Sequence, residues 1–255
     1  SPTASNHLLE GKDVKPVGVI DHHVISGKRV RLPFRDIRPS VAAAATIVCS
    51  YFWEQDLVPS SELATALVYA IRTETKGSEN PFSRLDVKAL SWLSPFADHN
   101  KLTEIENAPL TREYFSDLLL AIENTFIYDG IGICFLPTAS GPETIGEVAD
   151  LLIRCEQLEA LVCVGLVPPN ILISSRTRQG GGNATELLSA ALKGLGYCGG
   201  HEHRAGGKII LDNPERTKIS DELQSEIRAR WLSVTGREDM RGTRLVAKKD
   251  ILENL

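Results

Sequence analysis

The sequence predicts an α/β protein of two domains, and three features carry this prediction. The chain has 255 residues, 42% of them hydrophobic, which is enough to bury one large core or two modest ones. An apolar run at residues 16–20 stops abruptly at three polar side chains, as a buried strand does at its end. From about residue 124 onwards, strand and helix patterns alternate.

These patterns divide the chain into a first domain at residues 1–123 and a second at residues 124–255, with a cleft expected between them. The first domain is expected to hold an incomplete parallel sheet, and the second a smaller mixed α/β fold. Helices are predicted in the first domain at residues 40–53, 60–71 and 111–122, with a further helix starting after a cap at Ser83. The second domain should contain strands at residues 130–136, 160–167 and 171–175, and helices at residues 140–154, 183–195 and 220–233.

Composition restricts the class of protein and its partners. The longest apolar stretches fall far short of the roughly 18 residues that cross a bilayer, so no membrane partner is expected. The five cysteines are scattered, which suits reduced thiols in a cytoplasmic protein better than a disulfide framework. A net charge of −5 argues against a long nucleic-acid footprint, because neutralising many phosphates requires a surplus of basic side chains. A small anionic ligand stays compatible with this charge, and so does a homodimer.

Asp21-His22-His23 is the first candidate site. Imidazole nitrogens and carboxylate oxygens are suitable ligands for divalent manganese, zinc or iron. Successive side chains at a strand end point in different directions, so one can bind a metal while another faces a substrate. A histidine pair taken alone is more often part of a polar loop.

Glu74 is the second candidate. It lies near the carboxyl end of a predicted helix, where the helix dipole disfavours a carboxylate unless a cation compensates its charge. That cation can be a metal ion, or it can be Arg72 or Lys76. Judged alone, the segment is more typical of a solvated helix end.

The third candidate combines Ser174-Ser-Arg176 with the glycine-rich loop expected from Gly199 to Gly207. Successive glycines let backbone amides approach an anion, and His201, His203 and Arg204 add donors. The pattern predicts a phosphate cradle, although glycine-rich segments also form ordinary tight turns.

Together, in this order, the segments resemble the DHH phosphoesterase superfamily, in particular its RecJ-like, nano-RNase and pAp-phosphatase branch. Asp21-His22-His23 matches the motif that names the family. The other matching segments are Phe34-Arg-Asp-Ile-Arg-Pro-Ser40, Ala43-Ala-Ala-Thr-Ile47, Ala70-Ile-Arg-Thr-Glu-Thr75, Ser174-Ser-Arg176 and Gly199-Gly-His201.

The resemblance implies a role for each matching residue. In the first domain, Asp21, His22 and His23 are the catalytic residues: His22 binds metal, Asp21 orients the site and His23 faces the scissile phosphate. Glu74 takes the place of a second metal ligand. In the DHH-associated second domain, the residues implied to bind substrate are Ser174, Arg176, Gly199, Gly200, His201 and Arg204. The implied cofactor is Mn²⁺ or Mg²⁺, normally two ions.

Three departures from the family pattern affect these expectations. Glu74 replaces an aspartate, and Cys198 replaces the first glycine of the Gly-Gly-Gly-His motif. The family also carries an Asp-x-Asp motif well upstream of Asp-His-His, yet only 20 residues precede Asp21 and no Asp-x-Asp occurs in the chain. We therefore expect that an amino-terminal segment is missing and that metal binding is weakened or lost in the chain as given.

Three functions are compatible with this pattern. The first is a metal-dependent phosphoesterase, including exonuclease activity, on short oligonucleotides, pAp or a similar small nucleotide. The second is a catalytically incomplete chain that binds nucleotide through Arg176 and His201. The third is an exopolyphosphatase, because the same metals would cleave a phosphoanhydride.

Overall fold

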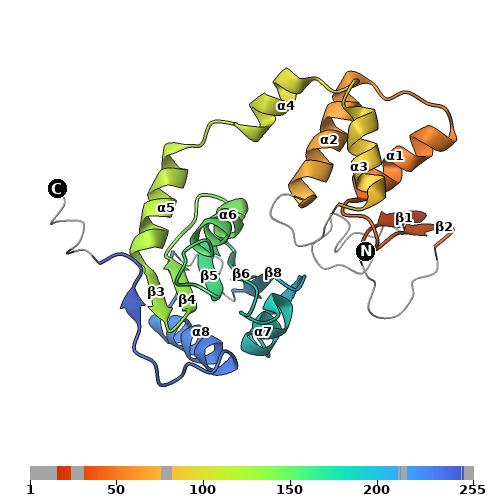
Figure 1. Cartoon of the computed structure of the whole chain (residues 1–255). Helices are drawn as coiled ribbons and strands as arrows, with labels where there is room; N and C mark the ends of the chain where they lie inside the picture. The colour runs from red at the N-terminus through yellow and green to blue at the C-terminus, as the bar shows by residue number, and fades with distance from the viewer. Residues whose placement is uncertain are drawn as a thin grey trace. The chain divides into compact units, whose positions relative to one another are not determined.

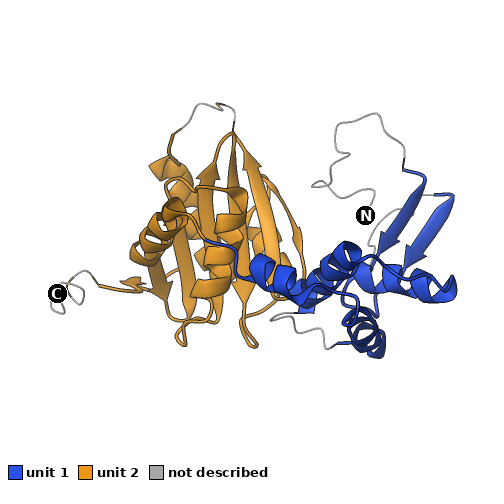
Figure 2. Ribbon diagram, turned by 90° about the horizontal axis from the view of Figure 1, so that it is seen from above, with its two compact units in different colours: residues 1–109 blue, residues 110–255 orange. Residues whose placement is uncertain are grey.

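The computed structural model describes residues 16–23, 32–75, 82–211, 213, 217–247 and 249. The chain forms two compact units, Ser1–Pro109 and Leu110–Leu255 (Figure 2). The division falls earlier in the chain than the expected boundary after residue 123. The reason is helix α5 (Arg112–Glu123), whose Leu118, Ala121 and Ile122 pack into the core of the second unit.

Within its described residues, the first unit combines a parallel strand pair with four helices. Strands β1 (Gly18–Asp21) and β2 (Phe34–Ile37) run parallel, which agrees with the expected parallel sheet. The helices are α1 (Ala44–Glu54), α2 (Ser61–Thr75), α3 (Arg84–Leu93) and α4 (His99–Glu106). Their apolar faces form one core that includes Ile71, Leu93 and Leu102. Helix α4 was not predicted, because Leu102 is its single buried residue and its apolar pattern is therefore weak.

A buried carboxylate joins two helix starts in this unit. Asp86 is fully buried and accepts hydrogen bonds from the Ala42 and Ser83 amides, at 3.1 and 2.8 Å, and from the Thr46 hydroxyl, at 2.6 Å. Its own amide donates to Ser83 Oγ, which completes the capping box expected at Ser83. The start of α1 and the start of α3 are therefore held by one side chain.

In the part of the second unit that the structure describes, the strands form a seven-stranded mixed sheet of order β7-β8-β6-β5-β4-β3-β9. Strands β4 and β5 pair in parallel, and the other neighbours pair antiparallel. The elements are β3 (Thr125–Tyr128), β4 (Ile131–Leu136), α6 (Pro142–Leu152), β5 (Ala160–Val167), β6 (Asn170–Thr177), α7 (Ala184–Ala191), β7 (Tyr197–Gly200), β8 (Arg204–Ile210), α8 (Asp221–Val234) and β9 (Thr243–Arg244).

Helices cover the two faces of this sheet unequally (Figure 1). Helices α7 and α8 pack on one face, where Leu188 and Trp231 join a core that extends from β4 to β8. Helices α5 and α6 pack on the other face, where Ala121 and Val148 join a core formed with β3, β4 and β5. The second core therefore does not extend over β7 and β8. The candidate site of this unit lies on that uncovered part of the sheet.

Most predicted elements are confirmed, and one expectation is corrected. The strand at residues 160–167 and the Asn183 cap, which accepts from the Thr185 and Glu186 amides, are as predicted. The segment from Gly199 to Gly207, expected as a loop, instead belongs largely to the antiparallel strands β7 and β8. Its glycines suggested a turn, but pairing with β6 provides the backbone hydrogen bonds that a strand needs.

Among the helices of the described residues, none combines the length and the apolar character that a membrane span requires. The five cysteines are all free, with Cys49, Cys134 and Cys163 buried, which agrees with the expectation of core thiols.

The Asp86 contacts lead to a stability prediction. Asp86→Ala should lower the free energy of unfolding by about 3 kcal/mol, because two amides and a hydroxyl lose their acceptor in the core. Asp98→Ala, which removes the α4 cap from a more exposed position, should cost about 1 kcal/mol. Urea denaturation of the full chain measures both values, and equal losses would contradict the anchoring role of Asp86.

Candidate functional site

Asp21, His22 and His23 gather at the carboxyl end of β1, as the sequence predicts. Asp21 is the last residue of the strand and is buried, His22 is half-buried and His23 is exposed. One potential ligand atom from each of the three lies within 4.8 Å of the others. Asp21 Oδ1 accepts from the His23 amide at 3.0 Å and lies 2.6 Å from His23 Nδ1. The three side chains therefore bring together ligand atoms of the types that a divalent cation binds.

The Asp21 carboxyl is kept in its charged form. Burial raises its pKa, but hydrogen bonding, with the His23 amide and ring among the donors, outweighs burial and lowers the pKa overall. The ionised carboxylate and the ring of His23 are joined through Nδ1. The group thus offers both carboxylate oxygen and imidazole nitrogen as ligand types.

A polar network on β2 and α1 supports the end of β1. Asp36 accepts two hydrogen bonds from Arg38, at 2.9 and 2.7 Å, and one from the Tyr51 hydroxyl at 2.6 Å. Arg38 also donates to Ser50 Oγ, and its amide donates to the carbonyl of Asp21 at 3.0 Å. The network therefore links α1 directly to the backbone of the Asp-His-His motif. The sequence analysis named residues 34–40 as a segment that matches the family but did not single out these side chains.

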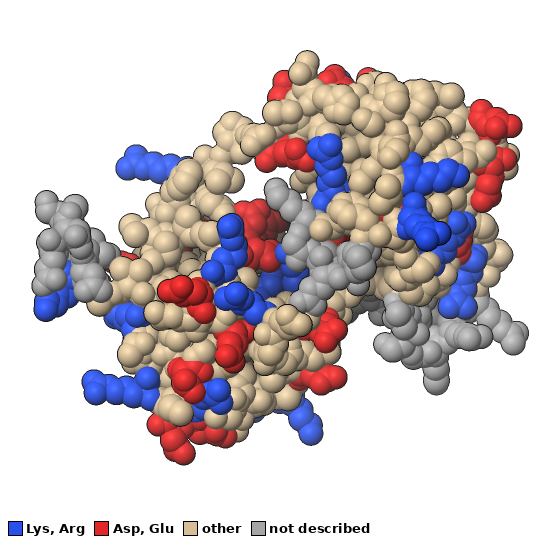
Figure 3. All heavy atoms as spheres, viewed as in Figure 1, with Lys and Arg blue, Asp and Glu red and all other residues tan. Residues whose placement is uncertain are grey.

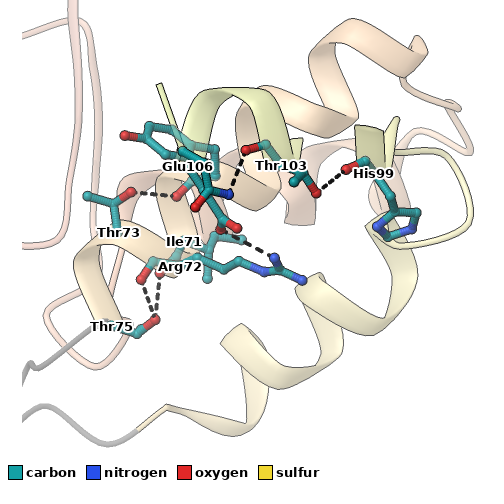
Figure 4. A network of polar contacts seen from close by, with 9 residues as sticks. Ile71, Arg72, Thr73, Thr75, His99, Thr103 and Glu106 are labelled. Carbon is teal, nitrogen blue, oxygen red and sulfur yellow. Dashed lines mark hydrogen bonds and ion pairs between the residues drawn. The ribbon is translucent and has the colours of Figure 1, made fainter. Parts of the chain in front are cut away.

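The surroundings of Glu74 differ from those of the Asp21, His22 and His23 cluster. It is exposed near the end of α2 and is not one of the residues that form the Asp21, His22 and His23 cluster among the described residues. Arg72 makes its ion pair with Glu106 of α4, at 3.3 Å (Figure 4). Lys76, the other cation considered, lies outside the described residues. The metal-ligand role of Glu74 therefore stays a prediction.

In the second unit, the strand register brings several predicted residues onto one face of the sheet. Ser174 lies opposite Gly206 and Arg176 lies opposite Arg204 across β6 and β8, while Gly199 lies opposite Gly206 across β7 and β8. Residues directly opposite each other in a sheet point to the same side. Both arginines contact Asp150 of α6, so this is the α6 side of the sheet.

On the β7 and β8 part of this face, the backbone is bare at Gly199 and Gly206. A Cβ built on Gly199 or Gly206 meets no described atom within 4 Å, whereas one on Gly207, which points to the other face, lies 2.7 Å from Leu192 Cδ1. The glycines thus have two different roles: Gly207 permits close packing against the α7 region, and Gly199 and Gly206 leave a floor that a ligand can approach. We call Gly199 and Gly206 the glycine floor, and Arg204 and Lys208 flank it on the same face of β8.

Gly200 and His201 lie beside the glycine floor. Gly200 pairs with Ala205 and so points to the opposite face from Gly199. A Cβ on Gly200 would lie 2.3 Å from the Arg204 carbonyl oxygen, so only glycine fits this position. The exposed His201 donates its amide to that carbonyl at 2.7 Å, and its own carbonyl accepts from Thr185 at the start of α7. The hairpin end is therefore anchored to a helix.

Three residues around the glycine floor were missed by sequence reasoning. Asp150 lies on α6, where nothing in the local pattern sets it apart from other helical acids. Lys208 shares the face of Gly206, and Tyr197, 64% exposed, lies opposite Lys208. Tyr197 and Gly199 are two positions apart, so they share one face of the sheet once the segment is recognised as a strand. In the view of Figure 3, basic and acidic side chains are interspersed over the visible surface.

Comparison with known proteins shows similarity to a longer protein. An uncharacterized protein of Methanocaldococcus jannaschii is 31% identical over 223 residues, which cover 86% of this chain and 45% of that protein. The chain thus spans about half the length of the curated relative that it matches. No protein-family profile matches the chain.

Comparison with solved structures shows the fold. An exopolyphosphatase-related protein from Bacteroides fragilis aligns with a TM-score of 0.65 and 15% identity, over 86% of this chain and 64% of that one. Similarity at this identity establishes a common architecture, which confirms the predicted α/β fold class. A pGpG-specific phosphodiesterase from Vibrio cholerae aligns over 79% of this chain at 13% identity, with a TM-score of 0.44, too low to indicate a shared fold.

The Asp36 network leads to a pH prediction. Hydrogen bonding from Arg38 lowers the pKa of Asp36 below its ordinary value of 3.8, against the opposing effect of burial. A lowered folded-state pKa contributes stability that is present above about pH 4 and is lost as the pH falls through the folded value. The free energy of unfolding should therefore fall more steeply below about pH 4 in the wild type than in Asp36→Asn.

Urea midpoints measured at a series of pH values test this expectation. Asp56→Asn, at an exposed position of the same unit, is the matched control and should keep the wild-type slope. Parallel pH profiles for the wild type and Asp36→Asn would show that the network does not hold the carboxylate.

Proposed function

We propose that this chain acts as a metal-dependent phosphoesterase on small phosphorylated substrates, in particular short oligonucleotides, pAp or a similar nucleotide. The observation that supports it most is the gathering of Asp21, His22 and His23 at the carboxyl end of a parallel strand. In α/β sheets this end is where ligands bind. The fold shared with an exopolyphosphatase-related protein is consistent with phosphate-ester or phosphoanhydride chemistry, and so is the resemblance to the DHH superfamily.

The first unit would hold the cation. His22, with a ring nitrogen, and Asp21, with a carboxylate oxygen, provide ligand types that suit Mn²⁺. When bound, Mn²⁺ supplies a Lewis acid that offsets negative charge on the phosphoryl oxygens. His23, which is exposed and joined to Asp21 through Nδ1, would face the scissile phosphate. Asp36 and Arg38 keep the strand end in position through the Asp21 carbonyl.

The second unit would hold the substrate. The glycine floor exposes backbone beside Arg204 and Lys208, which favours an anionic group that can approach the sheet closely. Tyr197 presents an exposed ring at the edge of the same face, where a nucleobase can stack. With a net charge of −5 on the chain, a short ligand suits this surface better than a long nucleic acid.

A second candidate function is nucleotide binding without hydrolysis. The three gathered side chains offer one ligand atom each, which is fewer than the four to six donors that usually surround such a cation. The glycine floor, in contrast, is formed within the second unit alone. This difference favours weakened metal binding with retained ligand binding, and it makes the two functions separable by experiment.

A hydrolysis assay with Mn²⁺ tests the first function. The chain should release mononucleotides or phosphate from short oligoribonucleotides or pAp, and His22→Ala should lower the rate by about 100-fold or more, because loss of a Lewis acid costs several kcal/mol in the transition state. His99→Ala, at an exposed histidine of the same unit, is the matched control and should leave the rate unchanged. Inorganic polyphosphate serves as a third substrate.

The outcomes separate the candidates. Hydrolysis that is equally fast in His22→Ala would contradict a role for the Asp-His-His group. Calorimetric binding of a mononucleotide without Mn²⁺-dependent turnover would favour the binding function. Neither binding nor turnover on any of the three substrates would rule out both functions for this chain.

A further inference from the structure

The two arginines on the α6 side of the sheet differ in how much of their hydrogen-bonding capacity is already used. Arg176 and Arg204 are direct cross-strand partners, so two positive charges lie side by side. Like charges opposite each other in a sheet repel unless an acid compensates them. Asp150 of α6 fills this role, because it makes ion pairs with both arginines.

Arg176 is saturated by the protein itself. A guanidinium carries five N–H donors. Two of them reach Asp150, from Nε at 2.8 Å and from Nη2 at 3.2 Å. The other three reach Ser174 Oγ at 2.6 Å, the Ser175 carbonyl at 3.0 Å and the Gly146 carbonyl at 3.4 Å. The side chain is only 12% exposed. A phosphate could contact Arg176 only by displacing an internal acceptor.

Arg204 is in the opposite situation. Its side chain is 45% exposed, and its guanidinium makes one ion pair among the contacts of the described residues, from Nη2 to Asp150 Oδ1 at 3.2 Å. Arg204 also lies two residues from Gly206 on the same face of β8, which places their Cα atoms about 7 Å apart. Lys208 lies the same distance beyond Gly206. The open backbone at Gly206 is therefore flanked by two cations.

We infer that Arg204 makes the direct contact to the substrate phosphate, and that Asp150, held by the saturated Arg176, is a positioning residue that orients Arg204 over the glycine floor. This inference rests on the proposed function of the second unit and assigns different roles to two arginines that the sequence places in one group. The ligand is a phosphate monoester or a terminal phosphate, because a compact anion with several acceptor oxygens can meet both the guanidinium fork and the exposed backbone.

Substitutions at the three positions separate direct contact from positioning. The probe is adenosine 5′-monophosphate, with inorganic phosphate as a second ligand, titrated into the full chain by calorimetry. Arg204→Gln should raise the Kd about tenfold or more, the effect of losing a charge-assisted hydrogen bond, and should leave the unfolding temperature almost unchanged. Arg230→Gln, at a partly exposed arginine of α8, is the matched control for the loss of one positive charge.

Asp150→Asn gives the sharpest test, because charge and geometry predict opposite results. Removing a negative charge beside an anion site should tighten binding if Asp150 acts only through its charge. If Asp150 positions Arg204, binding should weaken by about threefold or more, and Asp150→Glu, which keeps the carboxylate, should restore part of it. Arg176→Gln should mainly lower the unfolding temperature, and its effect on Kd should not exceed that of Asp150→Asn.

Specific results would overturn the inference. Tighter binding by Asp150→Asn, or wild-type Kd in Arg204→Gln, would contradict it while leaving the proposed function intact. If Arg176→Gln weakens binding as much as Arg204→Gln does and leaves the unfolding temperature unchanged, then Arg176 makes the direct contact to the phosphate. If Arg176→Gln does not fold, the Asp150 and Arg204 variants still decide the question. Absence of phosphate binding by the wild type would overturn both this inference and ligand binding by the second unit.

Discussion

The double contact between Arg176 and Asp150 is the interaction on which the candidate ligand surface depends. It joins β6 to α6, and it requires the helix to lie close to the sheet. Gly165 of β5 makes this approach possible, because a Cβ there would lie 2.0 Å from Ile145 Cδ1 of α6. With α6 in place, its carboxylate compensates two arginines that would otherwise repel each other across β6 and β8. The cationic edge of the glycine floor is thus a consequence of helix packing.

Each unit contains an aspartate that contacts segments distant in sequence, and the two aspartates differ in role. In each, one aspartate side chain connects segments that are distant in sequence: Asp86 joins the start of α1 to the start of α3, and Asp150 joins α6 to two strands. Asp86 is fully buried and its acceptor capacity is spent on amides and a hydroxyl, so its role is structural. Asp150 is 38% exposed, which allows its contacts to respond to a ligand. Burial therefore distinguishes the aspartate that stabilises from the aspartate that orients.

The candidate site of the first unit could be predicted from sequence further than that of the second. Asp21, His22 and His23 are consecutive, so the end of a single strand is enough to bring them together. The supporting contacts from Asp36, Arg38 and Tyr51 could not be predicted, because they depend on how α1 packs against β2. The second site draws on α6, β6, β7 and β8, and its members become neighbours only through strand register and helix placement.

The local features of this chain could be predicted from the residue pattern alone: the helix caps at Ser83 and Asn183, the buried strand at residues 160–167 and the Asp-His-His group. Each depends on residues within a few positions of one another, whose preferences are expressed without the rest of the fold. Three other features became visible in the folded chain: the glycine-rich segment is a strand pair, α5 belongs to the second unit, and Arg176 and Arg204 share one carboxylate. These outcomes follow from pairing and packing between distant segments, which local patterns do not specify.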